Sequence, residues 1–188
     1  MKTGAIFLKA LVIGGFVLSA ANFSPEAQAA TPLTAANKTT LGSATAANVQ
    51  ATITSLLAAA PAADREQLAV DIVTHLGSVL AAGREQTLQR AVQTAVALVP
   101  NKAPRIAAAA AQAVSGRTDI RQADKGIMMG VILRGVKFGA PSEFEATKEV
   151  LVQALPAFRR NFDLVTPPSQ TAPPVLPDGS NPFVTSPS

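Results

Sequence analysis

Prolines and glycines divide the middle of this chain into short stretches in which apolar residues recur every three or four positions. That spacing places the apolar side chains on one face of an α-helix. Many of these residues are alanine, which buries little area each, so we expect closely packed helices. The spacing predicts six helices, over about residues 44–60, 64–83, 84–99, 104–116, 119–138 and 142–162.

Residues at the ends of these stretches support the predicted boundaries. Asp64, Asp119 and Ser142 are each followed three residues later by Gln or Glu, and such a pair satisfies two backbone donors at the start of a helix. Pro61 ends the first helix, because proline cannot continue the hydrogen-bond ladder. Pro156 is expected to kink the last helix or to end its regular part.

The predicted helices are joined by only a few residues, so consecutive helices must double back as antiparallel hairpins. Residues 65–68 (REQL) recur loosely as residues 84–88 (REQTL). Two-helix units of about 40 residues are also the period of HEAT-like and armadillo-like solenoids. We therefore expect one all-α domain over residues 44–164. It is either a helical bundle or a short right-handed stack of the HEAT-like or armadillo-like kind.

The first 29 residues have the three parts of a secretory signal peptide. Lys2 and Lys9 supply the basic start, residues 10–21 the apolar core, and Ala27 and Ala29 the small residues before the cleavage site. We expect cleavage after Ala29 and a secreted or periplasmic product. The apolar core is shorter than the roughly 20 residues of a membrane span, and no cysteine is available for a lipid, so we expect no stable membrane anchor after cleavage.

Two segments beside the predicted domain lack helical periodicity. Residues 30–43 are small and polar, which predicts a flexible N-terminal segment. Residues 165–188 contain seven prolines, each of which removes a hydrogen-bond donor and restricts the preceding residue. We expect this Pro-rich C-terminal tail to be disordered or extended as polyproline.

The charge of the chain argues against binding to nucleic acid. Removal of the predicted signal peptide would leave 14 basic and 11 acidic residues, a net charge of +3. Apart from Arg159-Arg160 the basic residues are scattered singly, and the chain has neither Trp nor Tyr to stack on bases.

The single histidine, His75, follows Asp71 by one helical turn, so the carboxylate could orient the imidazole as in a nucleophilic triad. The third member would have to be a Ser or Thr from another helix, and the chain contains no G-x-S-x-G nucleophile elbow. A boundary histidine paired with Asp71 is the simpler interpretation. One His and no Cys also make a zinc site a poor prediction.

Glu145 and Glu149 lie one turn apart in the last predicted helix, with Lys148 between them. Paired carboxylates are what a glycosidase or a divalent-ion site requires. Their position in the first turns of the helix has a simpler explanation, because acidic side chains there stabilise the positive end of the helix dipole.

Four glycines, at positions 126, 130, 135 and 139, punctuate the fifth predicted helix. Gly126 and Gly130 form a G-x-x-x-G pair, which lets two backbones approach closely. Charged residues on both sides leave too few uncharged residues to span a membrane. We expect this to be the most buried helix of the domain, with glycines where its neighbours press against it.

These observations predict a small exported α-helical protein that is not an enzyme and has no catalytic, cofactor or metal site. The expected role is a protein-binding or structural scaffold of the bacterial envelope or extracellular space, with any protein partner held by the helical surface. Two alternatives stay open. One is a hydrolase that uses His75 and Asp71, or Glu145 and Glu149; the other is a protein that attaches to membrane surfaces through an amphipathic helix over residues 119–138.

Overall fold

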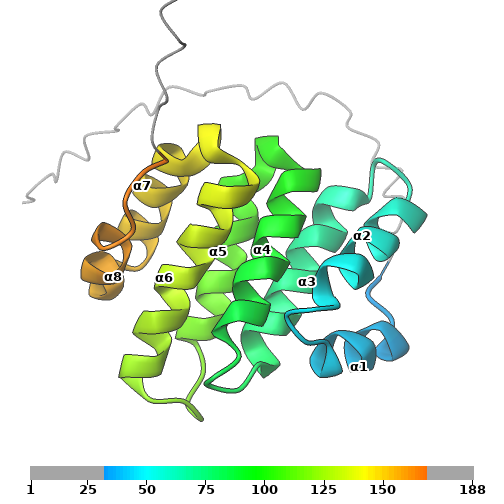
Figure 1. Cartoon of the computed structure of the whole chain (residues 1–188), viewed down its shortest axis with the longest axis horizontal. Helices are drawn as coiled ribbons and strands as arrows, with labels where there is room; N and C mark the ends of the chain where they lie inside the picture. Colours follow the sequence, from blue (N-terminus) through cyan, green and yellow to red (C-terminus); the bar gives the residue numbers. More distant parts are fainter. Residues whose placement is uncertain (1–31, 169–188) are drawn as a thin grey trace, which may run out of the picture.

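The computed structural model describes residues 32–168, so the predicted signal peptide and all but the first four residues of the predicted tail lie outside the described part. Within residues 32–168 the regular secondary structure is entirely helical (Figure 1), which confirms the all-α prediction. The α-helices are α1 (Ala35–Ser43), α2 (Val49–Ala59), α3 (Arg65–Val79), α4 (Glu85–Leu98), α5 (Ala103–Ser115), α6 (Gln122–Gly139), α7 (Phe144–Ala154) and α8 (Arg159–Asp163). Short 3₁₀ helices precede α5, α7 and α8, at Pro100–Lys102, Pro141–Glu143 and Pro156–Phe158.

The described residues form eight α-helices, so the prediction of six is wrong, and the first difference lies at the N-terminal end. α1 forms inside the segment over 30–43 that is predicted to be flexible. The Thr34 side chain accepts a hydrogen bond of 3.2 Å from the backbone N–H of Asn37, and Leu41 is fully buried. A side-chain cap and one buried leucine therefore hold a helix whose other residues show no periodicity.

The second difference lies at the C-terminal end, where the helix predicted over 142–162 is divided in two. α7 ends two residues before Pro156, which begins a 3₁₀ turn, and α8 starts at Arg159. The expected effect of Pro156 is confirmed, because its ring cannot donate the hydrogen bond that would continue α7.

None of the three predicted capping pairs forms. Asp64 stands at the start of α3, but its side chain makes no cap hydrogen bond to the helix, and Gln67 donates to Asp71 at 2.8 Å. α6 begins at Gln122 rather than next to Asp119, and the Asp119 carboxylate instead accepts hydrogen bonds of 2.6 and 3.0 Å from the Arg117 guanidinium. Ser142 lies in the 3₁₀ turn before α7, which begins at Phe144. A nearby arginine and a proline-led turn thus override the local pattern that predicts the caps.

The helices form two layers, one of odd-numbered and one of even-numbered helices (Figure 1). Within the layers, α3 packs most extensively on α5, and α4 on α6; α1 and α7 extend the odd layer, and α2 and α8 the even layer. Because a short turn reverses the chain after each helix, the helices of one layer run in the same direction.

The buried positions recur along the chain with a period of about 40 residues. In the odd layer, buried Leu68, Ile72 and Leu76 of α3 correspond to residues 38 positions later, Ile106, Ala110 and Val114 of α5. In the even layer, buried Leu88, Val92 and Ala95 of α4 correspond to residues 41 positions later, Met129, Leu133 and Val136 of α6. The hairpins α3–α4 and α5–α6 therefore share a spacing of buried positions.

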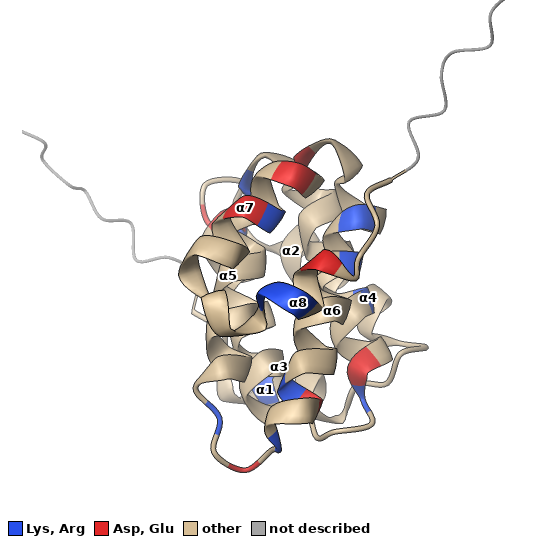
Figure 2. Ribbon diagram, turned by 90° about the vertical axis from the view of Figure 1, so that its left-hand side faces the viewer, with Lys and Arg blue, Asp and Glu red and all other residues tan. Residues whose placement is uncertain are grey.

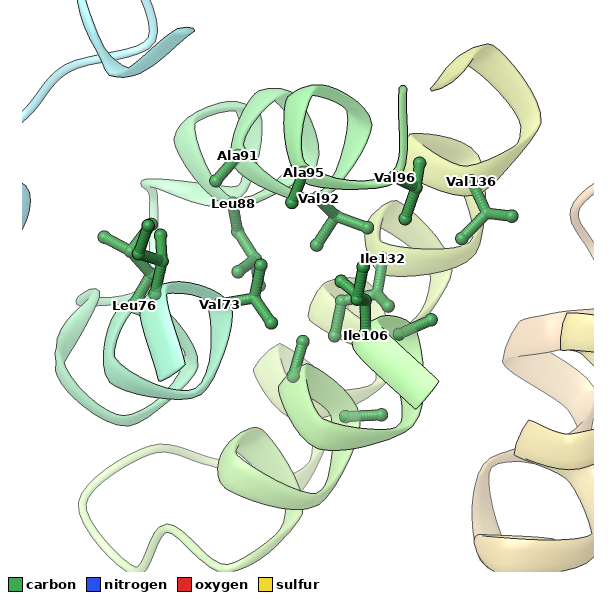
Figure 3. Close-up of a cluster of buried hydrophobic side chains, with 14 of the residues drawn as sticks. Val73, Leu76, Leu88, Ala91, Val92, Ala95, Val96, Ile106, Ile132 and Val136 are labelled. Atoms are coloured by element: carbon green, nitrogen blue, oxygen red, sulfur yellow. The ribbon is translucent and has the colours of Figure 1, made fainter. Parts of the chain in front are cut away.

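The core lies between the two layers. Figure 3 shows Val73 and Leu76 of α3 facing Leu88 and Val92 of α4, with side chains of α5 and α6 completing the cluster. Burial of this apolar surface is the main stabilising contribution in a chain that has no cysteine to form disulfides.

Glycines set the distance between helices within a layer. A Cβ atom on Gly135 would lie 2.8 Å from the backbone oxygen of Gln89 and 2.9 Å from Cβ of Val92, and one on Gly139 would also overlap α4. In the odd layer, a Cβ atom on Gly77 would lie 2.9 Å from the backbone oxygen of Ala110. The expectation that glycines of α6 lie where its neighbours press against it is confirmed, although the pair against α4 is Gly135 and Gly139.

Two buried or half-buried arginines join successive odd helices. Arg84, in the turn after α3, donates to the backbone oxygens of Gly42 and Ala44 at the end of α1. Arg117, in the turn after α5, donates to those of Gly77 and Leu80 at the end of α3. Each arginine satisfies carbonyl groups that the end of a helix leaves unpaired.

Candidate functional site

The predicted pair of His75 and Asp71 lies on the outer side of α3, beside α1. A pocket of about 420 Å³ that opens to solvent is lined there by these two side chains, Thr74, Ser78, Lys38 and the two residues Pro32 and Leu33. The fold therefore brings a histidine, a carboxylate and two hydroxyl groups into one pocket.

The groups of this pocket do not assemble as a nucleophilic triad. His75 Nε2 is 3.0 Å from the backbone oxygen of Lys38, so this nitrogen donates to α1. The Asp71 carboxylate accepts a hydrogen bond of 2.8 Å from Gln67, and the Ser78 hydroxyl donates to the backbone oxygen of His75 at 2.7 Å. His75, Asp71 and Ser78 thus each have a structural partner, whereas a triad would require a chain of hydrogen bonds among the side chains themselves.

Glu145 and Glu149 lie on the exposed side of α7, at an open groove of about 630 Å³ between α7 and α8. The groove also contains Lys148 and Arg159, whose nitrogens lie 3.0 and 3.7 Å from oxygens of Asp163. The cations belong to ion pairs with Asp163, and both glutamates are open to water. This is the arrangement of a solvated helix face rather than of a pair of catalytic carboxylates in a shielded cleft.

A different surface stands out in the even layer, where the outward sides of α2, α4 and α6 lie side by side. We call it the even-helix face. Its residues recur at helical spacing and are exposed, except for half-buried Gln93 and Gly130. They are Ala51, Thr54 and Ala58 in α2, Gln86, Arg90, Gln93 and Ala97 in α4, and Ile127, Gly130, Arg134 and Phe138 in α6.

Two large apolar side chains are exposed on this face. Ile127 is 54% exposed and Phe138 is 57% exposed, on either side of Arg134 along α6. Leu98, at the end of α4 and outside this face, is 47% exposed. Sequence periodicity does not distinguish these residues, because α4 and α6 also carry apolar residues on their buried sides. The sequence signal that could have identified them is a large apolar residue outside the buried stripe of its helix.

The even-helix face has no carboxylate among its residues. Neither Arg90 nor Arg134 has an acidic side chain within ion-pair distance in the described part of the chain. Arg90 borders a hollow of about 310 Å³ that it lines with Gln86, Ala46 and Ala47. Unpaired arginines and exposed apolar residues therefore occupy one face.

The odd layer and the α7–α8 end of the molecule carry carboxylates, in contrast to the even-helix face. α3 carries Glu66 and Asp71, and α7 carries Glu145 and Glu149. Figure 2, which views the molecule from the α7–α8 end, shows acidic and basic positions side by side on α7 and basic ones on α8. Acidic side chains are thus available on the odd layer but absent from the even-helix face.

Two carboxylates away from this face are held in their charged form by basic neighbours. Desolvation acts to raise the pKa of Glu66, but hydrogen bonds and charge from Lys102 and Arg105 outweigh it and lower that pKa. The hydrogen bonds from Arg117 lower the pKa of Asp119 to about 2. Glu66 joins α3 to the start of α5, and Asp119 holds the Arg117 side chain that donates to the end of α3, so both carboxylates have a structural role.

Among residues 32–168, no helix is both long and apolar enough to cross a bilayer. The same residues contain no group of three or more His, Cys, Asp or Glu side chains placed to hold a metal ion. Comparisons with models of protein families, with curated proteins and with solved structures give no match.

Proposed function

We propose that this chain is an exported scaffold without a reaction of its own, and that it binds another protein through the even-helix face. We also propose that its hairpins form a short right-handed stack of the HEAT-like kind, for which the recurrence of buried positions after 38 and 41 residues is the support. Such stacks commonly present an extended surface of parallel helices to a partner.

The observation that carries the binding role is the exposure of Ile127 and Phe138 beside the unpaired Arg134. Aromatic residues and arginine are enriched in protein interfaces, and such residues contribute most of the binding free energy when a partner excludes water from them. By contrast, His75, Asp71 and Ser78 in the His75 pocket each have a structural hydrogen-bond partner. The geometry therefore supports the hydrolase alternative less than it supports the binding role.

A photo-crosslinking experiment tests the binding role. A photoreactive amino acid is placed at Gln93, on the even-helix face, and in a matched variant at Gln112, an exposed residue of α5 in the odd layer. In cells of the source organism we expect one partner, identified by mass spectrometry, to crosslink from Gln93 but not from Gln112. Equal products from both positions, or none from either, would contradict the proposal.

Binding by the purified partner gives the second measurement. Phe138→Ala is expected to weaken binding by about tenfold or more, because truncation of an aromatic residue that a partner shields from water typically costs this much. Val150→Ala removes an apolar side chain that is 38% exposed on α7, away from the face, and serves as the control.

Export has its own test, which is the N-terminal sequence of the protein recovered from the periplasm or the medium. Cleavage after Ala29 gives a chain that begins at Ala30. A chain found only in the cytoplasm with its first residues intact would contradict export.

A further inference from the structure

The two arginines of the even-helix face indicate which kind of partner fits it. We infer that the partner presents an acidic segment, in which carboxylates alternate with apolar side chains, to α2, α4 and α6. This inference rests on the proposed function, because it gives the chemistry of the partner for the same face.

Arg134 supplies the first contact. It lies seven residues after Ile127 and four before Phe138, so the three side chains follow one line along the outward side of α6. Its guanidinium has no carboxylate within ion-pair distance in residues 32–168. A carboxylate from a partner binds this planar group through two parallel hydrogen bonds, while apolar side chains on either side cover Ile127 and Phe138.

Arg90 supplies the second contact, on the neighbouring helix. The hollow that it lines with Gln86, Ala46 and Ala47 has a volume of about 310 Å³, which is large enough for an acidic side chain. The arginine guanidinium and the Gln86 amide are both donors, and the alanines leave space above them. A segment that spans α2 to α6 reaches both arginines.

Charge argues against a second copy of this chain on the same face. An isologous dimer through this surface would bring four arginines and no carboxylate together, and like charges across an interface disfavour association. A lipid surface fits less well than an acidic protein segment. Ile127 and Phe138 are 11 residues apart, or about 16 Å along the helix, with Arg134 between them, so the face offers no continuous apolar stripe to a bilayer.

Binding of a defined probe to the purified chain tests the inference. The probe is a fluorescent peptide of alternating leucine and glutamate pairs, and its control is the same peptide with glutamine in place of every glutamate. We expect the acidic peptide alone to bind. Arg134→Gln and Arg90→Gln should each weaken binding by about tenfold, since a buried charge pair that loses one partner costs this much or more. Lys38→Gln, which removes an exposed positive charge from α1, should change binding by less than about twofold.

Three results would overturn the inference. One is equal binding of the two peptides, and another is equal loss in the Lys38 and Arg134 variants. The third is Arg134-dependent sedimentation with phosphatidylcholine vesicles that contain phosphatidylglycerol, in the absence of peptide binding, which would assign the arginines to a membrane.

The crosslinking experiment separates this inference from the proposed function. If the product from Gln93 persists in the Arg134→Gln variant and in about 0.5 M salt, where exposed charges are strongly screened, the face binds a protein that is not acidic. The proposed function would then stand while the acidic partner is excluded. Loss of the product in both conditions supports the acidic partner.

Discussion

In the centre of the fold, α4 and α6 approach so closely that a Cβ atom on Gly135 would lie 2.8 Å from a backbone oxygen of α4. At the N-terminal end, α1 buries only one of its own residues, Leu41. Polar contacts with its backbone hold it instead: His75 Nε2 lies 3.0 Å from the oxygen of Lys38, and Arg84 donates to two carbonyls. Close apolar packing holds α4 and α6 together, whereas α1 depends on hydrogen bonds to its backbone groups.

At the C-terminal end, α7 also has one neighbour within its layer, α5, but it is held by apolar burial. α7 buries Phe144, Thr147 and Leu151 against the rest of the odd layer. The hydroxyl of Thr147 is fully buried and has no hydrogen-bond partner in the described residues. A polar atom without a partner is thus tolerated at the end of the layer, where α3 and α5 place Leu68 and Ile106 at the corresponding positions.

The comparison is tested most strongly by the same substitution at the two regions. Leu88 in α4 and Leu41 in α1 are both fully buried. We expect Leu88→Ala to lower the free energy of unfolding by about 3–5 kcal/mol, because packed helices surround the cavity. Leu41→Ala should cost about 1–3 kcal/mol, since α1 can detach locally without opening the core. Urea unfolding followed by circular dichroism gives both values, and equal losses would remove the distinction between centre and end.

A second test concerns the close approach of the central helices. Gly135→Ala adds a methyl group against the backbone of α4, and we expect it to lower the free energy of unfolding by about 1–3 kcal/mol. Gly130→Ala is the matched control in the same helix, because its nearest contact would be an ordinary 3.7 Å. Alanine favours a helix over glycine, so this variant should gain up to about 1 kcal/mol. A gain in both variants, measured by thermal unfolding, would show that α4 and α6 can move apart at little cost.

Local signals in the sequence predicted the central helices well. Pro61, Gly83 and Pro100 mark ends that the structure has within a few residues, and the apolar spacing between them identifies the buried sides. These signals act between neighbours in the chain, so a single sequence contains them.

Contacts between distant residues could not be predicted in the same way. Arg84 and Arg117 reach carbonyls about 40 residues earlier, and neither lies in a pattern that distinguishes it from a solvated arginine. The pair of Gly135 and Gly139 has the same G-x-x-x-G spacing as Gly126 and Gly130. Which pair meets α4 depends on how the two helices are rotated against each other, and that is decided by the whole core. The same rotation determines which residues lie on the even-helix face.

A smaller effect is expected at the C-terminal end. Thr147→Val replaces the buried hydroxyl without a partner by a methyl group of similar size, and we expect a gain of about 1 kcal/mol in the free energy of unfolding. Thr94→Val is the control, because the buried Thr94 hydroxyl donates a hydrogen bond of 2.8 Å to the backbone oxygen of Arg90. That variant should gain nothing or lose stability. If both variants gain equally in urea unfolding, the unpaired hydroxyl is not what distinguishes α7.

The smallest expected effect is a dependence on acid at the junction of α3 and α6. Asp119 has a pKa of about 2 in the folded chain, below its ordinary value of 3.8, because Arg117 donates to it. A folded-state pKa below the unfolded one stabilises the fold above the unfolded value, and this contribution is lost as the pH falls from about 4 to about 2. The wild type should therefore exceed Asp119→Asn in urea midpoint at pH 5, and the two midpoints should converge near pH 2. Because the Asp119 side chain is 65% exposed, the difference should be small. The sign of the midpoint difference is still informative, because Arg117 without a carboxylate partner would hold the end of α3 less firmly. A midpoint difference that grows on acidification would contradict the role of this pair.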